Sequence, residues 1–414
     1  MFKTYLHIAL IGLLSTLNFT LSTTRCFAEV PRLTVVVVAN GLTEEHIPQL
    51  RPYWLQGGLQ AFQSEMFFST VNFNQTLYGG DEALVTLLTG TTPRTSGYAM
   101  DTIFDRVLRK PIAVIEDKTQ DGIGTPLRLS LQGVRTATVG DELRLDYGKN
   151  SKIYAIGVHP ITTMIMAGHT ANACCWWDNI TEQWVSTTYY PEGLPTAAFD
   201  WNNSDKKNKQ TLNESITSVA LEIQRTQQMG LDNVPDMLFI EYDLSQEDTN
   251  LDVLMNQLIL RVGRHNLQLF VLGTPVPAQP SSFNIDRAAA LTSTYLIALY
   301  GTERWVNGGW KNSIYLNQSL MEQKRISLPQ IKAQVCTFLM DFEGVAAAYP
   351  VEDAMVLPET KENINKHCAG DVIVCLEHDW LYREPQATLL WWREDKTYPT
   401  HPINALDVKH LIYK

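Results

Sequence analysis

Short runs of apolar, mostly β-branched residues constrain the fold of this chain more than any other feature of its sequence. Residues 33–38 read Leu-Thr-Val-Val-Val-Val, which is typical of a strand buried on both faces of a sheet. The same character recurs in residues 153–158, 237–242, 267–272, 293–300 and 371–376. We therefore expect a sheet whose central strands are covered on both sides.

The segments between these runs have the apolar spacing of amphipathic helices. Ile216, Val219 and Ile223 fall on one helical face, and residues 251–258 and 331–342 show the same spacing. Strands that alternate with helices predict a largely parallel sheet with helices on both faces, because each helix packs back onto the sheet between two strands. The expected fold class is α/β.

The stretch from residue 176 to residue 209 departs from this pattern, because it is rich in Trp, Tyr, Asn and Pro and has no clear period. We interpret the region of residues 160–210 as an inserted cap or long loop, and residues 301–327 as a second irregular stretch. Large aromatic side chains often anchor contact surfaces, so those of the first stretch predict either a partner-binding patch or rings that pack the cap onto the sheet. These residues are Trp176, Trp177, Trp184, Tyr189, Tyr190 and Trp201.

Residues 1–28 have the composition of a secretory signal peptide. Lys3 gives the positive start, residues 8–14 are apolar, and Cys26-Phe27-Ala28 ends on a small residue of the kind that signal peptidase reads. The apolar core is too short to span a bilayer, and no later stretch is long and apolar enough. We expect residues 29–414 to form an exported protein of the periplasm, the cell envelope or the extracellular space.

The net charge and the number of cysteines limit which partners and which disulfide bonds this chain can have. The formal net charge of −11 argues against nucleic acid as the main partner, because a polyanion would be repelled. Beyond Cys26 an odd number of cysteines remains, and an odd number cannot all pair within one chain. Their pairing stays open from the sequence; they are Cys174, Cys175, Cys336, Cys368 and Cys375.

Several short motifs occur in a characteristic order along the chain. Leu-Thr-Gly-Thr-Thr-Pro stands at residues 88–93, Val-Gly-Asp-Glu-Leu at residues 139–143 and Ala-Gly-His at residues 167–169. In this order they resemble motifs of the bacterial phosphate-irrepressible alkaline phosphatases, which are related to the nucleotide pyrophosphatases/phosphodiesterases. The resemblance implies one alkaline-phosphatase-like α/β sandwich with an inserted cap, and a family chemistry of two zinc ions and a Thr or Ser nucleophile.

Carried over position by position, the resemblance puts unsuitable residues at the functional sites of the family. The first zinc carboxylate falls on Ala39 and the nucleophile on Gly80, while the phosphate-holding amide falls on Asp101, whose charge would repel phosphate. The family's Asp-plus-His loop after Tyr242 and its carboxyl-terminal segment are nearly absent. The phosphate clamp and the remaining zinc ligands fall on His159, Ile161, Pro275, Val276 and Trp392.

Some polar groups near these positions keep more than one interpretation open. His159 could be a substitute base or a lone metal ligand, or only a histidine at a strand end. Asp81 and Glu82 could be a displaced acid pair, or acids that favour the start of a helix. His169 could be a ligand, or a structural residue retained with Gly168.

The resemblance and the replaced residues together predict a catalytically degenerate alkaline-phosphatase-like protein. It would act in binding or assembly with a protein partner in the cell envelope, and would need no cofactor. One alternative is a divergent metal-dependent hydrolase of phosphate or sulfate esters, for which zinc would be expected. A further alternative is a metal-free sensor of a small molecule.

Overall fold

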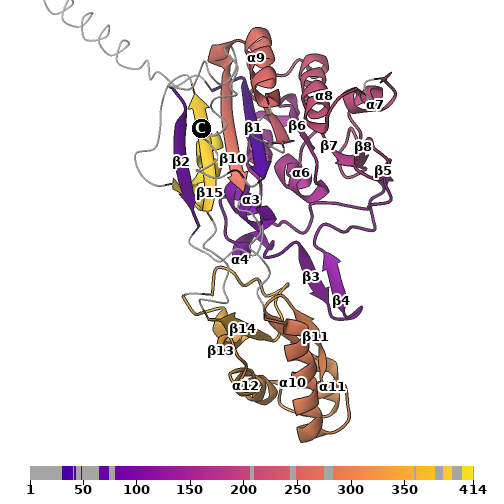
Figure 1. Cartoon of the computed structure of the whole chain (residues 1–414), viewed down its shortest axis with the longest axis vertical. Helices are drawn as coiled ribbons and strands as arrows, with labels where there is room; N and C mark the ends of the chain where they lie inside the picture. The colour runs from indigo at the N-terminus through magenta and orange to yellow at the C-terminus, as the bar shows by residue number, and fades with distance from the viewer. Residues whose placement is uncertain are drawn as a thin grey trace, which may run out of the picture.

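A computed structural model describes residues 30–40, 42, 48, 65–73, 80–205, 209–242, 249–274, 283–358, 360–377, 386–393 and 403–413. Within these residues a ten-stranded mixed sheet forms the centre of the molecule (Figure 1). Its strands, in order across the sheet, are β16 (Ile403–Asn404), β2 (Phe67–Asn72), β15 (Gln386–Arg393), β10 (Leu267–Thr274), β1 (Leu33–Asn40), β9 (Asp236–Tyr242), β6 (Ile153–Gly157), β7 (Ala173–Asp178), β8 (Gln183–Thr187) and β5 (Gly122–Ile123).

The central strands β10, β1, β9, β6 and β7 run parallel to one another. Most of them contain the apolar runs of the sequence, so the prediction of a largely parallel sheet is confirmed. Along β1, Leu33, Val35 and Val37 face one core, whereas Val36 and Val38 face the other, as the two-residue period of a strand requires. A strand with two buried faces reads as a continuous apolar run, because neither face needs polar residues.

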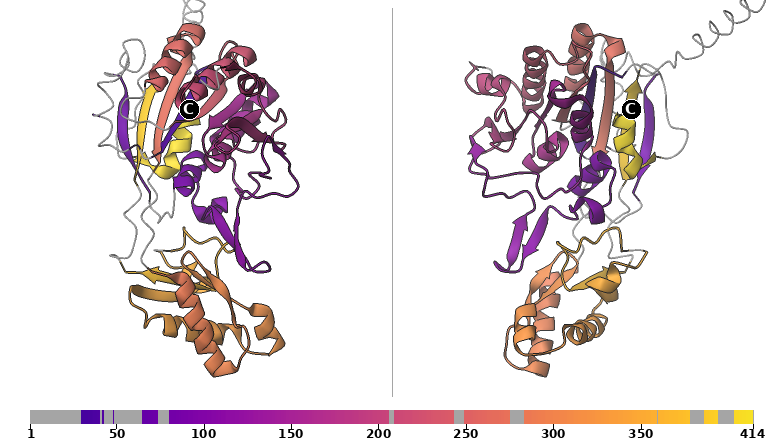
Figure 2. Two further views of the ribbon diagram at one scale, coloured as in Figure 1. Left: turned by 45° about the vertical axis from the view of Figure 1, so that its right-hand side comes forward. Right: turned by 180° about the vertical axis from the view of Figure 1, so that it is seen from behind.

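Helices cover both faces of this sheet, so the expected α/β class is confirmed (Figure 2). The core of one face takes in α3 (Gly80–Thr89), α5 (Val139–Tyr147), α6 (Pro160–Ala167) and α14 (Ala405–Tyr413). The core of the other face takes in α7 (Thr196–Asn202), α8 (Leu212–Gln227) and α9 (Asn250–Val262). α8 begins at a capping box between Thr211 and Glu214, which satisfies backbone N–H groups that the first turn leaves free.

Residues 160–210 do not form the expected cap. β7 and β8 extend the main sheet, and α6 and α7 pack against its faces. The sequence shows no period here because β7 is buried on both faces and because a tight turn and a short helix interrupt the pattern. Cys174 and Cys175 are fully buried and face opposite cores, so they cannot bridge each other.

The aromatic residues of this region lie mostly inside the protein. Each of four rings exposes no more than 5% of its surface: Trp176, Trp184, Tyr190 and Trp201. The rings of Trp177, Trp184 and Trp201 meet edge to face, with centroids 5.5–6.3 Å apart. Trp177 and Tyr189 keep partial exposure. These four residues therefore pack inside the protein and do not form the expected binding patch. Trp176 and Tyr190 belong to the core on one face of the sheet, and Trp184 and Trp201 belong to the core on the other.

Residues 283–377 form a lobe with a sheet and a core of its own. Its four-stranded sheet has the order β11 (Val306–Trp310), β12 (Ser313–Leu316), β14 (Val372–Leu376) and β13 (Val345–Pro350). The helices are α10 (Ile285–Tyr300), α11 (Gln318–Gln323), α12 (Leu328–Leu339) and α13 (Val351–Ala354). In Figure 1 the lobe lies beyond the carboxyl ends of the central strands of the main sheet.

The structure of the lobe confirms one prediction from the sequence and corrects two. The run at residues 371–376 is a strand, β14, although it belongs to the small sheet. The run at residues 293–300 is part of helix α10, which buries Ala288, Thr292 and Leu296 at the four-residue spacing of a helix face. A short apolar run fits a strand and a helix equally well, and here the N-cap at Asn284 starts a helix. Residues 301–327 hold β11, β12 and α11 rather than an irregular stretch.

A small hairpin joins the two parts of the structure. After the short helix α4 (Pro93–Ser96), β3 (Thr102–Asp105) and β4 (Lys110–Ala113) form a two-stranded antiparallel sheet beside the lobe (Figure 1). Arg106 at its turn pairs with the buried Asp371, with 2.7 Å between Nη1 and Oδ2. The indole of Trp310 donates to the carbonyl oxygen of Thr102 at 3.3 Å. These contacts fix the lobe against the hairpin.

The expected signal peptide lies outside the described residues. None of the helices in the described part of the chain has the length and apolarity that crossing a membrane requires.

Replacing Trp201 by Ala tests the packing role of the aromatic cluster. We expect a loss of about 3–5 kcal/mol in the free energy of unfolding, because the change leaves a large cavity against Trp177 and Trp184. Phe199 lies on the same helix but is 58% exposed, and Phe199→Ala should change stability by less than about 1 kcal/mol. Equilibrium denaturant unfolding measures both; equal effects of the two substitutions would contradict the packing role.

Candidate functional site

Strands β1, β9 and β6 end at one edge of the main sheet, where helices α3 and α6 begin. Ligands of parallel sheets collect at this edge, because the loops that follow the strands meet there. The hydroxyl of Thr162 in α6 donates to Asp81 in α3 at 3.1 Å, which joins the first turns of the two helices. The charges of Asp101, His159 and Glu241 act on Asp81 from neighbouring elements. These four titratable residues are the carboxyl-edge site.

A histidine–carboxylate pair is the most clearly built part of this site. The Nδ1 atom of His159 lies 2.8 Å from Oε1 of Glu241. The other oxygen of Glu241 accepts hydrogen bonds from the backbone N–H groups of Val158 and His159, at 2.8 and 2.9 Å. The Glu241 side chain is only 1% exposed, whereas that of His159 is 64% exposed. A buried carboxylate thus orients an imidazole whose side chain is largely exposed.

The sequence analysis identified His159 but missed Glu241. A signal for it was present, because Glu241 interrupts the apolar run Phe239-Ile240-Glu241-Tyr242 one residue before the strand ends. A buried acid in such a strand must have partners, since an unpaired buried charge is costly. An acid at the carboxyl end of a parallel strand therefore indicates a site rather than a packing residue.

Asp81 is a second unusual group at this edge. Burial raises the pKa of its carboxyl group to about 6, the hydrogen bond from Thr162 lowers it, and the negative charges of Glu241 and Asp101 raise it. The side chain therefore carries a proton under mildly acidic conditions in which an ordinary Asp is ionised. Asp81 and Glu82 lie in the first turn of α3, as the helix-start interpretation predicts, and Glu82 is 3% exposed there. A chemical role for Asp81 stays a prediction.

The described residues do not fit the two-zinc centre that the resemblance implies. Ala39 is fully buried at the end of β1 and Gly80 is the first residue of α3, and neither side chain has an atom that can bind a metal. Ile161 packs against the core, and Trp392 is fully buried in β15 with its indole directed to Glu65. Within the described part of the chain, no three His, Cys, Asp or Glu side chains are placed to hold a metal ion. Pro275 and Val276 lie outside the described residues.

The Gly168–His169 motif is structural in this fold. Asp141 accepts hydrogen bonds from the backbone N–H groups of His169 and Thr170 at 2.8 and 2.9 Å, and its other oxygen caps α5 through Thr138. The His169 ring meets the Tyr189 hydroxyl at 3.2 Å. This motif therefore ties the end of α6 to the start of α5, away from the His159–Glu241 pair.

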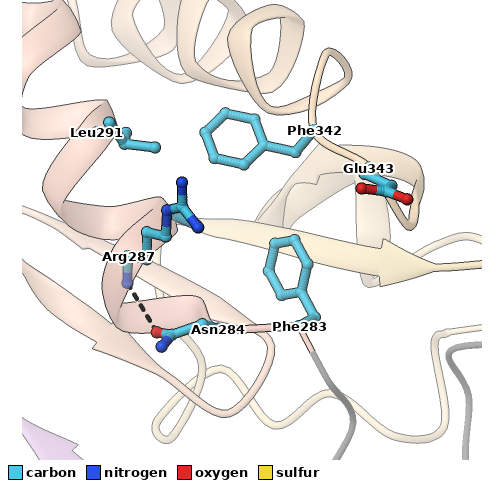
Figure 3. Close-up of a pocket in the computed structure, with 7 residues that line it drawn as sticks. Phe283, Asn284, Arg287, Leu291, Phe342 and Glu343 are labelled. Atoms are coloured by element: carbon cyan, nitrogen blue, oxygen red, sulfur yellow. Dashed lines mark hydrogen bonds between the residues drawn. The ribbon is translucent and has the colours of Figure 1, made fainter.

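A separate cavity of about 270 Å³ lies in the lobe, between the start of α10 and the turn after α12. Figure 3 shows the rings of Phe283 and Phe342 and the side chain of Arg287 lining it, with Glu343 at one side. Two aromatic rings and a guanidinium group suit a flat anionic molecule. None of the candidate functional residues identified from the sequence lines this cavity.

Replacing Asp81 by Asn tests the buried proton. Between about pH 4 and 6 the folded state keeps a proton that the unfolded state has lost, so this group lowers stability as pH rises through that window. Asp81→Asn removes the penalty, so it should gain roughly 1–3 kcal/mol of unfolding free energy above pH 7 and little at pH 4. Thermal unfolding across this pH range measures the gain, with Asp200→Asn on the exposed face of α7 as the control. A gain that does not depend on pH would contradict the assignment.

Comparisons with known proteins agree with this architecture. No model of a known protein family matches the chain. The alkaline phosphatase PhoV of Synechococcus elongatus is 26% identical over 185 residues, which are 43% of this chain and 33% of that protein. The alkaline phosphatase PafA of Elizabethkingia meningoseptica is 28% identical over 123 residues, 29% of this chain and 22% of that protein. The matching segments thus span a third or less of these curated relatives.

The similarity in structure extends over nearly the whole chain. The crystal structure of wild-type alkaline phosphatase PafA superimposes with a TM-score of 0.74 at 15% identity, covering 92% of this chain and 94% of that one. The fold is therefore that of the alkaline phosphatases. Sequence similarity and fold together place the chain in the alkaline phosphatase superfamily.

Proposed function

We propose that this chain is a divergent hydrolase of phosphate or sulfate esters that works at the carboxyl-edge site. Membership of the superfamily supports an ester hydrolase. The observation that carries the proposal is the His159–Glu241 pair, in which a buried carboxylate holds an exposed imidazole at 2.8 Å. Pairs of this kind prepare a histidine for proton transfer.

Glu241 sets the proton positions of this pair. One of its oxygens accepts from two backbone N–H groups and the other meets Nδ1 of His159, which donates to it in this proposal. When Nδ1 carries the hydrogen, Nε2 is the ring nitrogen that can accept a proton. Nε2 can accept a proton from a water molecule as the water oxygen bonds to the phosphorus or sulfur atom of the ester.

Asp81 supplies the complementary proton. The bond from phosphorus or sulfur to the leaving oxygen breaks, and the leaving oxygen takes the proton that Asp81 holds below about pH 6. One acid and one base of different pKa at one site are the usual requirement for such a reaction. We expect the rate to fall as pH rises above about 6, because Asp81 then loses its proton.

A second candidate function is a non-catalytic binding protein. Ala39 and Gly80 favour it, because the positions of the superfamily's first metal carboxylate and of its nucleophile hold side chains without reactive groups. In this candidate the expected partner is a protein of the cell envelope. Trp177 and Tyr189, which remain partly exposed beside β7 and β8, are the aromatic residues that such a partner could still reach.

Turnover of aryl esters decides between the two candidates. We expect the purified protein to hydrolyse bis(4-nitrophenyl) phosphate or 4-nitrophenyl sulfate with EDTA present. His159→Ala and Glu241→Gln should each lower kcat by roughly 10²-fold or more, which is the usual contribution of a general base. His367→Ala replaces an exposed histidine of the lobe and serves as the matched control.

Absorbance of released 4-nitrophenol measures these rates. Background turnover by the wild type would reject the hydrolase and leave the binding protein. Turnover that EDTA abolishes would reject the role of His159 as the base and favour metal-dependent hydrolysis.

A further inference from the structure

A lysine from the lobe reaches the carboxyl-edge site. Lys311 lies in the two-residue turn between β11 and β12, and its Nζ atom is 3.3 Å from Oδ1 of Asp101. The two side chains are 28% and 45% exposed, so the pair stays open to solvent and to a ligand. Lys311 therefore brings a positive charge to the carboxyl-edge site.

The position of Lys311 is fixed by neighbouring contacts of its hairpin. Trp310 donates to the carbonyl oxygen of Thr102 at 3.3 Å. Gly308 lies against the Phe104 ring, so closely that a Cβ atom there would come within 2.9 Å of it. The Arg106–Asp371 ion pair joins the turn between β3 and β4 to the residue that precedes β14 in the lobe. Because β11 and β3 are in contact, the turn that carries Lys311 is held beside Asp101.

An unmatched hydrogen-bond donor lies beside the same acids. Tyr98 is fully buried, and among the described residues its hydroxyl group has no hydrogen-bond partner. Burial raises the pKa of this hydroxyl, and the charges of Asp81, Asp101 and Glu82 raise it further, which places the group within their electrostatic reach. A buried hydroxyl without an acceptor is costly, which marks Tyr98 as an unusual group of this edge.

The charges of this edge restrict the ligand that it can hold. Asp101 and Glu241 carry carboxyl groups, Asp81 adds a further negative charge above about pH 6, and Lys311 pairs with Asp101. One lysine can balance one negative charge of a ligand. Each further negative charge on the ligand is repelled by the carboxylates, and this repulsion lowers affinity by roughly tenfold or more.

We propose that the carboxyl-edge site selects esters with a single negative charge, phosphodiesters or sulfate monoesters, and that Lys311 is the residue that binds their anionic group. This inference rests on the proposed function for the reaction, but the binding preference itself does not require turnover. Lys311 is a positioning and specificity residue, and Asp101 is its counter-ion when no ligand is bound.

Binding of two simple phosphates at pH 8 tests the preference without chemistry. Dimethyl phosphate carries one negative charge and methyl phosphate carries two, while both present phosphate oxygens. Isothermal titration calorimetry should show dimethyl phosphate binding at least about tenfold more tightly. Lys311→Met should lower the affinity for dimethyl phosphate by roughly tenfold or more. Lys324→Met, a lobe lysine paired with Glu303, makes the same charge change as a control and should have no effect.

Asp101→Asn gives a second variant that does not depend on how well Lys311→Met folds. Removing this carboxylate should raise the affinity for methyl phosphate and so reduce the difference in affinity between the two ligands. Methyl phosphate binding as tightly as dimethyl phosphate, or Lys311→Met behaving like Lys324→Met, would overturn the inference. An unchanged difference in affinity in Asp101→Asn would also overturn it.

Turnover measurements separate this inference from the proposed function. Methyl 4-nitrophenyl phosphate and 4-nitrophenyl phosphate differ by one charge and share a leaving group, and we expect the singly charged ester to have the higher kcat/KM. Selective binding of dimethyl phosphate without any turnover supports the inference and rejects the hydrolase. Turnover of both esters with equal kcat/KM supports the hydrolase and rejects the inference.

Discussion

The parallel pairing of β1 with β9 and β10 is the constraint on which the rest of this structure depends. β1 pairs along its whole length with β10, and from Leu33 to Ala39 with β9, so the three strands end at one level. Val38 stands opposite Glu241 in this register. A slip by one residue would turn every side chain of β1 to the other face of the sheet, where the two cores would no longer match. The position of the carboxyl-edge site follows from this pairing.

Electrostatics at that edge depend on how each acid is held. Glu241 is buried but has backbone N–H donors and an imidazole, which offset the cost of burying its charge. Asp81 has the Thr162 hydroxyl and lies among other acids, so its charged form is disfavoured. The two carboxyl groups are thus held in different ways at one edge of the sheet, which is the basis of the roles proposed for them.

The lobe matters because it brings charge to an otherwise acidic edge. Its attachment relies on the buried Asp371, which accepts from Arg106, from the amide of Gln318 and from the backbone of Leu316. The Arg106 guanidinium also lies over the Tyr315 ring, 5.0 Å from its centroid. A buried carboxylate with several donors is a strong local tether, because removing any one partner leaves charge unsatisfied. Lys311 reaches Asp101 through this arrangement.

The sequence by itself determined the α/β class, the central strands and the superfamily, because β-branched runs and ordered motifs are local properties of the chain. It also singled out His159 and Asp81, since a polar residue next to a strand end or helix start is visible in one dimension. It misassigned residues 293–300, because a short apolar run fits either period until a cap and a packing partner decide. It could not place the aromatic residues at 176–201, since burial depends on which strands lie beside them. Only the tertiary structure joined Glu241 to His159 and Lys311 to Asp101, because residues 82 and 210 positions apart meet through the pairing of strands and the docking of the lobe.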